Sequence, residues 1–207
     1  MTDAPGRAPD VRVCFVGDSF VAGVGDPQHL GWAGRLAAHS HHRGPALTSY
    51  NLGIRRDTTS DVLGRWRTEC SPRLPAGCRA GVVLSFGVND TSMERGASRV
   101  DPGTSAENLD ALLRQAGHAG WPVLTAGPPP VDDEEQNERI AVLDAAFAAV
   151  CARRVPYVAV LPTLRTDGVW RRQVRAGDGA HPGAEGYQVL ATLLLPAWRR
   201  WLSSLGR

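Results

Sequence analysis

Residues 11–20 have the sequence Val-Arg-Val-Cys-Phe-Val-Gly-Asp-Ser-Phe, and this stretch decides the fold class. The run up to Val16 is apolar apart from Arg12 and rich in valine, which is typical of a buried strand. Gly17 ends the run and permits a tight turn. Ser19 therefore follows directly on the end of the predicted strand, where it is available to a ligand.

The rest of the chain repeats this pattern of short apolar runs separated by stretches of helical period. Further strands are predicted over residues 46–52, 81–86, 122–126 and 157–161. Two amphipathic helices are predicted from residues that share a face: Leu109, Leu112, Leu113 and Ala116 in one, and Ile140, Leu143, Phe147, Val150 and Cys151 in the other. Thr104 and Glu107 match a capping box for the first. A last helix is expected over about 184–202, with Pro196 as a kink or break.

Strands and helices that alternate in this way favour a parallel sheet covered on both faces. We expect an α/β fold, a three-layer α/β/α sandwich with a five-stranded parallel sheet in the order 2-1-3-4-5. No linker or change of composition divides the chain, so we expect residues 1–207 to form one domain, with 1–9 disordered.

Composition and charge exclude several function classes. The formal net charge is +2, and the basic residues, all of them arginine, are spread along the chain, which argues against nucleic-acid binding. The N-terminus has no apolar signal segment, and the apolar stretch 189–198 is shorter than the roughly 20 residues that span a bilayer. We therefore expect a cytoplasmic protein without a membrane span, monomeric by default.

The four cysteines show no C-x-x-C spacing, so we expect no metal site. Cys14 lies in an apolar run and is expected to be a buried hydrophobe. Cys70 and Cys78 flank a loop and could pair in an oxidising compartment, but in the cytoplasm free thiols are expected.

Polar or glycine-rich segments follow the first three predicted strands, and ligands bind beyond the carboxyl ends of such strands. Ser19 follows the first strand, Gly53 the second and Asn89 the third. Just before the last helix, Asp178 precedes His181 by three residues across Gly179, so that its carboxylate can turn back to the ring.

These residue types together are suited to acyl transfer. A serine hydroxyl needs a base such as His181, and the imidazole needs a partner such as Asp178 to fix its tautomer. The N–H groups of Ser19 and Gly53 and the side-chain amide of Asn89 would serve as donors to the oxyanion. We predict Ser19, His181 and Asp178 as catalytic.

Four blocks of the sequence resemble, in order, those of the SGNH (GDSL-type) hydrolase family: Gly17-Asp18-Ser19, Gly53, Gly87-x-Asn89-Asp90 and Asp178-x-x-His181-Pro182. The similarity extends from about residue 11 to 200. It implies a flavodoxin-like fold, no cofactor, and activity as an esterase, lipase, thioesterase or carbohydrate deacetylase. By the family pattern the same catalytic and oxyanion residues are assigned. Phe20 departs from the leucine that is common there.

Each block also has a structural interpretation. Ser19 could cap a helix, and Gly53 could be a turn residue. Asn89–Asp90 could form an Asx turn with Asp90 holding the loop, and Asp178–His181 could be a surface turn.

Other clusters are expected to be structural. We expect His39, His41 and His42 at a helix end, Asp132–Glu135 in the first turn of a helix, and Arg171, Arg172 and Arg175 on a solvated face. Trp32 and Trp170 could line an acyl pocket or belong to the core.

The favoured function is a serine esterase that hydrolyses an ester or thioester of a small or medium acyl group through an acyl-enzyme. The same residues would also serve an acyltransferase. Two other classes stay open: a flavodoxin-like nucleotide or flavin binder, using the glycine-rich stretch 17–25, and a catalytically inactive carbohydrate-binding relative. The segments 91–103, 127–133 and 163–177 would shape the pocket.

Overall fold

The computed structural model describes residues 10–40 and 46–205. The disorder expected for residues 1–9, and the positions of His41 and His42, lie outside these ranges. Within them, no helix has both the length and the apolar character needed to cross a membrane.

The centre of the fold is a five-stranded parallel sheet in the order β2-β1-β3-β6-β7, which confirms the predicted order. The strands are β1 (Val11–Gly17), β2 (Leu47–Gly53), β3 (Arg79–Ser85), β6 (Val123–Ala126) and β7 (Tyr157–Val158). The register places Gly17 beside Gly53 on one side and Ser85 on the other. The carboxyl ends of three strands therefore meet at one edge.

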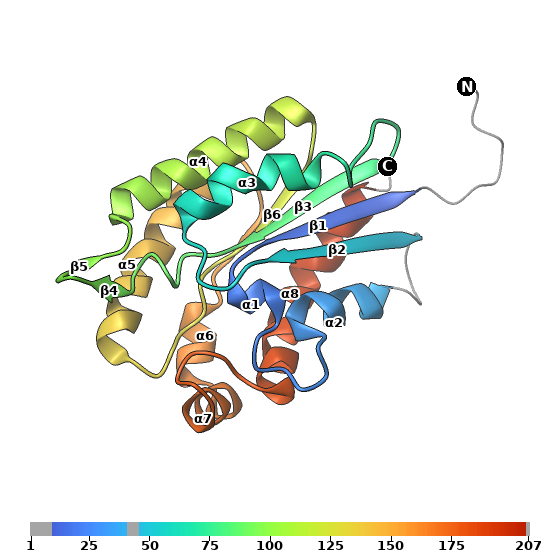
Figure 1. Ribbon diagram of the computed structural model, residues 1–207. Helices are drawn as coiled ribbons and strands as arrows, with labels where there is room; N and C mark the ends of the chain where they lie inside the picture. Colours follow the sequence, from blue (N-terminus) through green and yellow to red (C-terminus); the bar gives the residue numbers. More distant parts are fainter. Residues whose placement is uncertain (1–9, 41–45, 206–207) are drawn as a thin grey trace.

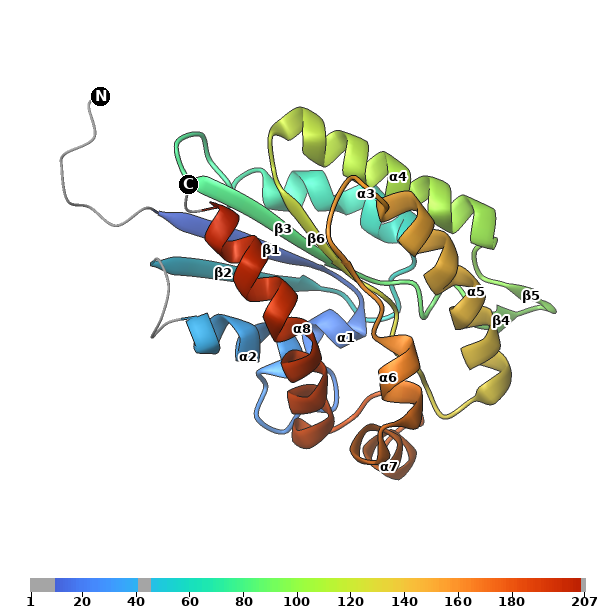
Figure 2. The ribbon, with the colours of Figure 1, turned by 180° about the vertical axis from the view of Figure 1, so that it is seen from behind.

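Helices cover both faces of the sheet. Successive residues of β1 point to opposite faces, and because both sets are mostly apolar, each face is buried by helices. Val13 and Phe15 pack with Trp198, whereas Cys14 and Val16 pack with Trp66. The first face carries α1 (Ser19–Ala22), α2 (Gly31–Ser40) and α8 (Ala184–Leu205), and the second carries α3 (Thr59–Cys70), α4 (Pro102–Ala119) and α5 (Glu134–Cys151) (Figure 1). Seen from behind, α8 crosses the sheet beside α2 (Figure 2).

Several local predictions were wrong. The strand predicted to reach Leu161 ends at Val158, and Leu161 begins α6 (Leu161–Thr166), where Pro162 suits the first turn of a helix but has no N–H for a sheet. The cap of α4 is Asp101, which accepts from the N–H groups of Gly103 and Thr104, so Thr104 is not part of a capping box. The helix α8 continues across Pro196, so of the predicted kink or break, the break is wrong.

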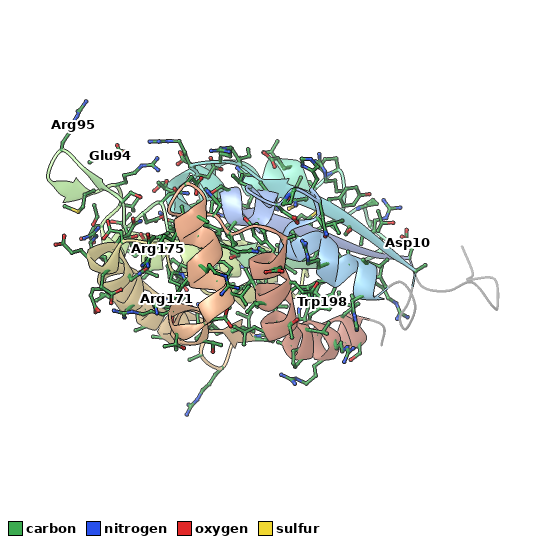
Figure 3. All side chains as sticks on the ribbon, turned by 90° about the horizontal axis from the view of Figure 1, so that it is seen from below. Asp10, Glu94, Arg95, Arg171, Arg175 and Trp198 are labelled. Carbon is green, nitrogen blue, oxygen red and sulfur yellow. The ribbon has the colours of Figure 1, made fainter. Side chains whose placement is uncertain are left out.

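Two of the segments expected to shape a pocket contain regular structure. Residues 163–177 lie almost entirely in α6 and α7 (Gly168–Ala176), and the segment 91–103 contains the hairpin of β4 (Met93–Glu94) and β5 (Ala97–Ser98). Figure 3 shows Glu94 and Arg95 at the outer end of this hairpin. All four cysteines are free thiols, and Cys14 and Cys70 lie in the same buried cluster.

Candidate active site

The turn after β1 leaves no room for a side chain at its glycine. A Cβ on Gly17 would lie 1.8 Å from the Ser85 carbonyl oxygen, so the chain can enter α1 here only with glycine. Asp18 is the N-cap and accepts a hydrogen bond from the Phe20 N–H at 3.0 Å. The cap is therefore Asp18 and not Ser19. Ser19 is the first helical residue, and its N–H has no carbonyl four residues earlier in α1.

The Asp178–His181 segment is a tight turn that also aligns the two side chains. Gly179 has a φ of 79°, a conformation that glycine adopts without strain. Asp178 Oδ1 accepts from the N–H groups of Ala180 at 3.0 Å and His181 at 2.8 Å. Asp178 Oδ2 lies 2.7 Å from His181 Nδ1. The structural and the catalytic interpretations of this block are thus compatible.

The imidazole joins this turn to α1, although the two are far apart in sequence. His181 Nε2 lies 2.7 Å from Ser19 Oγ, across 162 residues of chain. Phe20 packs on the imidazole with ring centroids 4.8 Å apart, and it also stacks on Trp170 with ring centroids 6.3 Å apart. Trp170 is buried and donates to the Pro130 carbonyl, and Trp32 packs against Phe15 in the core. Three predicted residues are therefore brought together in one hydrogen-bonded chain.

Two aspartates beside the site have opposite electrostatic environments. Burial alone would raise the pKa of Asp178, but hydrogen bonds from the His181 N–H, the His181 ring and the Ala180 N–H outweigh it and lower the pKa to about 2. Asp178 therefore stays ionised at neutral pH. Burial raises the pKa of Asp18 to about 7, with the charges of Asp90 and Asp57 adding to the effect, and Asp18 Oδ2 has no partner among the described residues.

Gly53 packs directly against α1. A Cβ at this position would lie 2.2 Å from the Ala22 nitrogen and 2.7 Å from the Asp18 oxygen. The Gly53 N–H donates to Asn51 Oδ1 at 3.0 Å, and Asn51 Nδ2 donates to the Val21 carbonyl. Glycine here is thus required for packing, and its N–H has an internal acceptor.

The loop after β3 places Asn89 and holds it through Asp90. Asn89 Nδ2 donates to the Asp57 carbonyl at 2.9 Å. Asp90 is buried and accepts from the Thr59 N–H and hydroxyl and from the Ser105 hydroxyl, the last at 2.7 Å. Asp90 therefore ties this loop to α3 and α4, the structural role that was expected for it.

The remaining polar clusters are structural. Asp133 is the N-cap of α5, and Glu134 and Glu135 lie in its first turn. Arg165 pairs with Glu134 and Glu138, and Arg175 pairs with Asp132. Figure 3 shows Arg171 and Arg175 together on α7. His39 contacts Arg199. Residues 10–40 and 46–205 contain no group of three His, Cys, Asp or Glu side chains placed to hold a metal ion.

Sequence reasoning missed Arg65, a side chain on α3 that lies beneath the site. Its guanidinium contacts the carbonyl oxygens of Gly17 and Leu52, at the ends of β1 and β2. The local signals were the acidic residues Asp57 and Glu69, eight positions before and four after Arg65, and pairs of this kind are too common to be informative.

Comparison with known families gives a match over most of the chain. The model of the GDSL-like Lipase/Acylhydrolase family matches residues 15–189, most of the chain. This range contains all the residues predicted for the site. A comparison with curated protein sequences gives no significant match.

Solved structures with the same fold include several hydrolases. The lipase/acylhydrolase from Enterococcus faecalis has a TM-score of 0.74 and 24% identity, over 91% of this chain and 96% of that one. A structure named TesA has a TM-score of 0.75 and 23% identity, over 92% of this chain and 99% of that one. The psychrotrophic esterase EstA from a Pseudoalteromonas species, inhibited by monoethylphosphonate, has a TM-score of 0.71 and 17% identity, over 93% of this chain and 98% of that one. These likenesses confirm the three-layer fold.

Proposed function

The chain belongs to the GDSL-like lipase/acylhydrolase family and is a serine hydrolase acting on ester bonds; we propose that it hydrolyses esters or thioesters of small or medium acyl groups through an acyl-enzyme on Ser19. One observation carries this proposal. Asp178, His181 and Ser19 form a continuous chain of hydrogen bonds, with both distances to the imidazole nitrogens at 2.7 Å. Such a chain is the arrangement that turns a serine hydroxyl into a nucleophile.

In the first half-reaction, His181 Nε2 takes the proton of the Ser19 hydroxyl while Oγ bonds to the acyl carbon. The electron pair of the carbonyl double bond moves to its oxygen. The Asp178 carboxylate accepts a hydrogen bond from His181 Nδ1–H, which stabilises the imidazolium. The oxyanion then re-forms the double bond, the bond to the leaving alkoxide or thiolate breaks, and the imidazolium returns its proton to that leaving group.

In the second half-reaction, water takes the place of the leaving group. His181 removes a proton from the water as its oxygen bonds to the acyl carbon, and the bond to Ser19 Oγ breaks with return of the proton to Oγ. The products are a carboxylic acid and free Ser19. No cofactor takes part in these steps.

We assign the oxyanion contacts to the N–H groups of Ser19 and Gly53 and to Asn89 Nδ2. The Ser19 N–H is the first of α1 and lies on the nucleophile itself. Asn89 has a second N–H besides the one directed to Asp57. Gly53 would exchange Asn51 Oδ1 for the oxyanion, a stronger acceptor because it carries charge.

The test is intact-mass spectrometry after incubation with a fluorophosphonate, on wild type, Ser19→Ala and the control Ser60→Ala, a serine exposed at the same edge of the sheet. The inhibition of the Pseudoalteromonas esterase by monoethylphosphonate makes this class of probe appropriate. We expect one adduct on wild type and on Ser60→Ala, and none on Ser19→Ala. An adduct on folded Ser19→Ala, or none on wild type, would contradict the proposal.

Once Ser19 is shown to react, the acyl preference is measured with esters and thioesters of increasing chain length. Acetylated xylose belongs in this panel, because a similar fold with a TM-score of 0.72 is an acetylxylan esterase from Geobacillus stearothermophilus. Highest kcat/KM on long-chain esters would contradict the proposed preference for small or medium acyl groups.

A further inference from the structure

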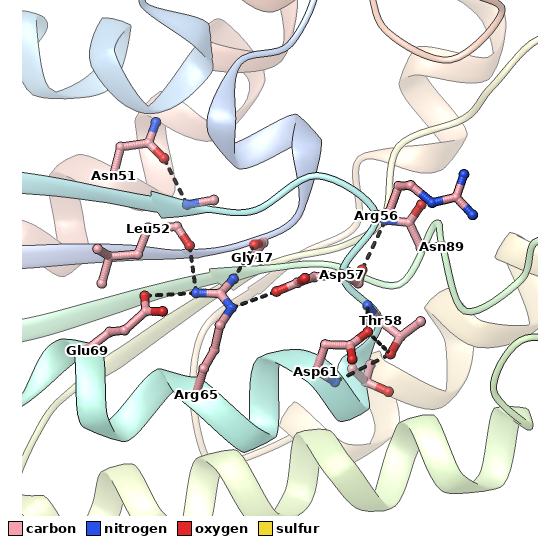
Figure 4. A network of polar contacts seen from close by, with 12 residues as sticks. Gly17, Asn51, Leu52, Arg56, Asp57, Thr58, Asp61, Arg65, Glu69 and Asn89 are labelled. Carbon is pink, nitrogen blue, oxygen red and sulfur yellow. Dashed lines mark hydrogen bonds and ion pairs between the residues drawn. The ribbon is translucent and has the colours of Figure 1, made fainter.

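Arg65 donates hydrogen bonds from all three of its guanidinium nitrogens, and most of these bonds lead toward the proposed oxyanion contacts (Figure 4). Nη1 donates to the Leu52 carbonyl at 3.0 Å, and Nη2 donates to the Gly17 carbonyl at 2.8 Å. Nε donates to Asp57 Oδ2 at 2.6 Å. Glu69, on the same helix, accepts from Nη1 at 2.9 Å. The side chain is 17% exposed, so it is held inside the protein.

Two of these bonds fix peptide groups at the ends of β1 and β2. The Leu52 carbonyl belongs to the same planar peptide as the Gly53 N–H. A bond to that carbonyl therefore orients the Gly53 N–H and, by polarising the peptide, makes it a stronger donor. The Gly17 carbonyl also accepts from the Ile54 N–H at 3.0 Å, so the same oxygen joins the nucleophile turn to the segment after Gly53.

The third bond reaches Asn89 through Asp57. The Asp57 side chain is 13% exposed and is held by Arg65, while the Asp57 carbonyl accepts from Asn89 Nδ2 at 2.9 Å. Loss of the guanidinium would release the Asp57 side chain and, with it, the carbonyl that orients the Asn89 amide.

A fork of several donors is needed for this arrangement. An arginine presents five N–H groups in one plane, whereas a lysine ammonium is a single point with three donors. Lysine at position 65 would keep the charge but could not contact both strand ends and Asp57 at once.

We propose that Arg65 is a positioning residue for the oxyanion hole, fixing the Gly53 N–H and, through Asp57, the Asn89 amide. This inference rests on the proposed function for its effect on catalysis, but the geometry can be tested separately.

The first experiment compares ¹⁵N NMR spectra of wild type, Arg65→Met, Arg65→Lys and the control Arg67→Met, an exposed arginine on the same helix. We expect the Gly53 amide and the Asn89 side-chain amide to shift in both Arg65 variants and to stay in place in Arg67→Met. If Arg65→Met does not fold, the comparison is made with Arg65→Lys, which keeps the positive charge. Unchanged Gly53 and Asn89 signals in a folded Arg65 variant would overturn the proposal.

The second experiment is a double-mutant cycle between Arg65→Met, or Arg65→Lys if needed, and Asn89→Ala. We expect the Arg65 change to lower kcat by about 10- to 100-fold in wild type, with little change in KM, because the contact it orders is made in the transition state. In the Asn89→Ala background the further loss should be only about threefold, carried by Gly53 alone. The same factor in both backgrounds would contradict positioning through Asn89.

The two proposals fail in different ways. If wild type shows neither turnover nor a phosphonate adduct, the esterase proposal fails, and the NMR comparison still decides whether Arg65 orders Gly53 and Asn89. If wild type turns over and the Arg65 variants match Arg67→Met in kcat, the esterase proposal stands and the role of Arg65 is wrong.

Discussion

On one side of the proposed site, Asp178 and His181 lie three residues apart in a single turn, and we call this pair the acid–base side. On the other side, Gly53 and Asn89 come from different strands and are held by bonds to Arg65 and Asp57; we call these two the oxyanion side. Asp178 has half of its side chain exposed, whereas the Arg65 and Asp57 side chains are mostly buried.

This difference shows on which side of the site a substitution can change turnover without changing the stability of the fold. The acid–base side takes its shape from local hydrogen bonds, so a substitution there should affect turnover while the fold is kept. The oxyanion side takes its shape from contacts between distant segments, so substitutions in its supports should affect turnover and stability together.

The largest effect is expected for Asp178→Asn, which tests the acid–base side. The amide oxygen can still accept the Ala180 and His181 N–H bonds, so the melting temperature should change little. The imidazole loses the partner that fixes its tautomer, and kcat should fall by about 10⁴-fold. Steady-state kinetics and thermal melts check this. A loss of less than tenfold, or a large fall in melting temperature, would break the comparison.

On the oxyanion side, Asn89→Ala should lower kcat by about 10²- to 10³-fold, the usual loss for one oxyanion donor. The matched control is Asn108→Ala, which removes a side chain that donates to Thr59 and Ser60 at the start of α3. Active-site titration with a phosphonate would give the concentration of folded enzyme by which the kcat of each variant is calculated. An increase in KM with unchanged kcat would make Asn89 a substrate-binding residue instead.

Asp18, the N-cap residue before Ser19, sharpens the comparison through pH. Its folded-state pKa of about 7 lies above the ordinary value of 3.8, so folded Asp18 binds more protons between these values, and its contribution to wild-type stability falls as pH rises from 4 to 8. Asp18→Asn removes this loss. The variant should gain on the order of 3 kcal/mol relative to wild type between pH 4 and pH 8 in urea unfolding. A pH-independent difference would argue against a buried, ionising Asp18.

The smallest effect is expected for Gly53→Ala. Its Cβ would overlap the Ala22 nitrogen, and unfolding free energy should fall by about 1–3 kcal/mol as α1 shifts. In the control Gly64→Ala, on α3, no atom lies within 4 Å of the new Cβ, and stability should rise by about 0.5–1 kcal/mol. Denaturant unfolding measures both. Equal changes would show that the contact between Gly53 and α1 is loose.

The same division explains what the sequence could predict. Parallel strands of valine-rich sequence place their following residues at one edge, so the positions of Ser19, Gly53 and Asn89 followed from the strand order. The bond between Asp178 and His181 followed from their spacing across Gly179. Each of these inferences needed only local pattern and a general rule of sheet topology.

The parts that were missed depend on competition or on distant contacts. Asp101 caps α4 in place of Thr104 because Pro102 suits the first helical position. The two-residue strands β4 and β5 are too short for any periodicity to be detected. The bonds of Arg65 to Leu52 and Gly17 span 13 and 48 residues, and nothing at position 65 indicates those acceptors.

The bond between Ser19 and His181 joins the turn after β1 to the segment that leads into α8. In the same way, Trp198 of α8 donates to Ser40 of α2 at 2.7 Å. Proteins with many contacts of such sequence separation fold slowly, because the loop between the partners must close before the contact can form. The fraction of Ser19 that reacts with a phosphonate, added at successive times after dilution from denaturant, would therefore measure how fast α8 packs onto the rest of the fold.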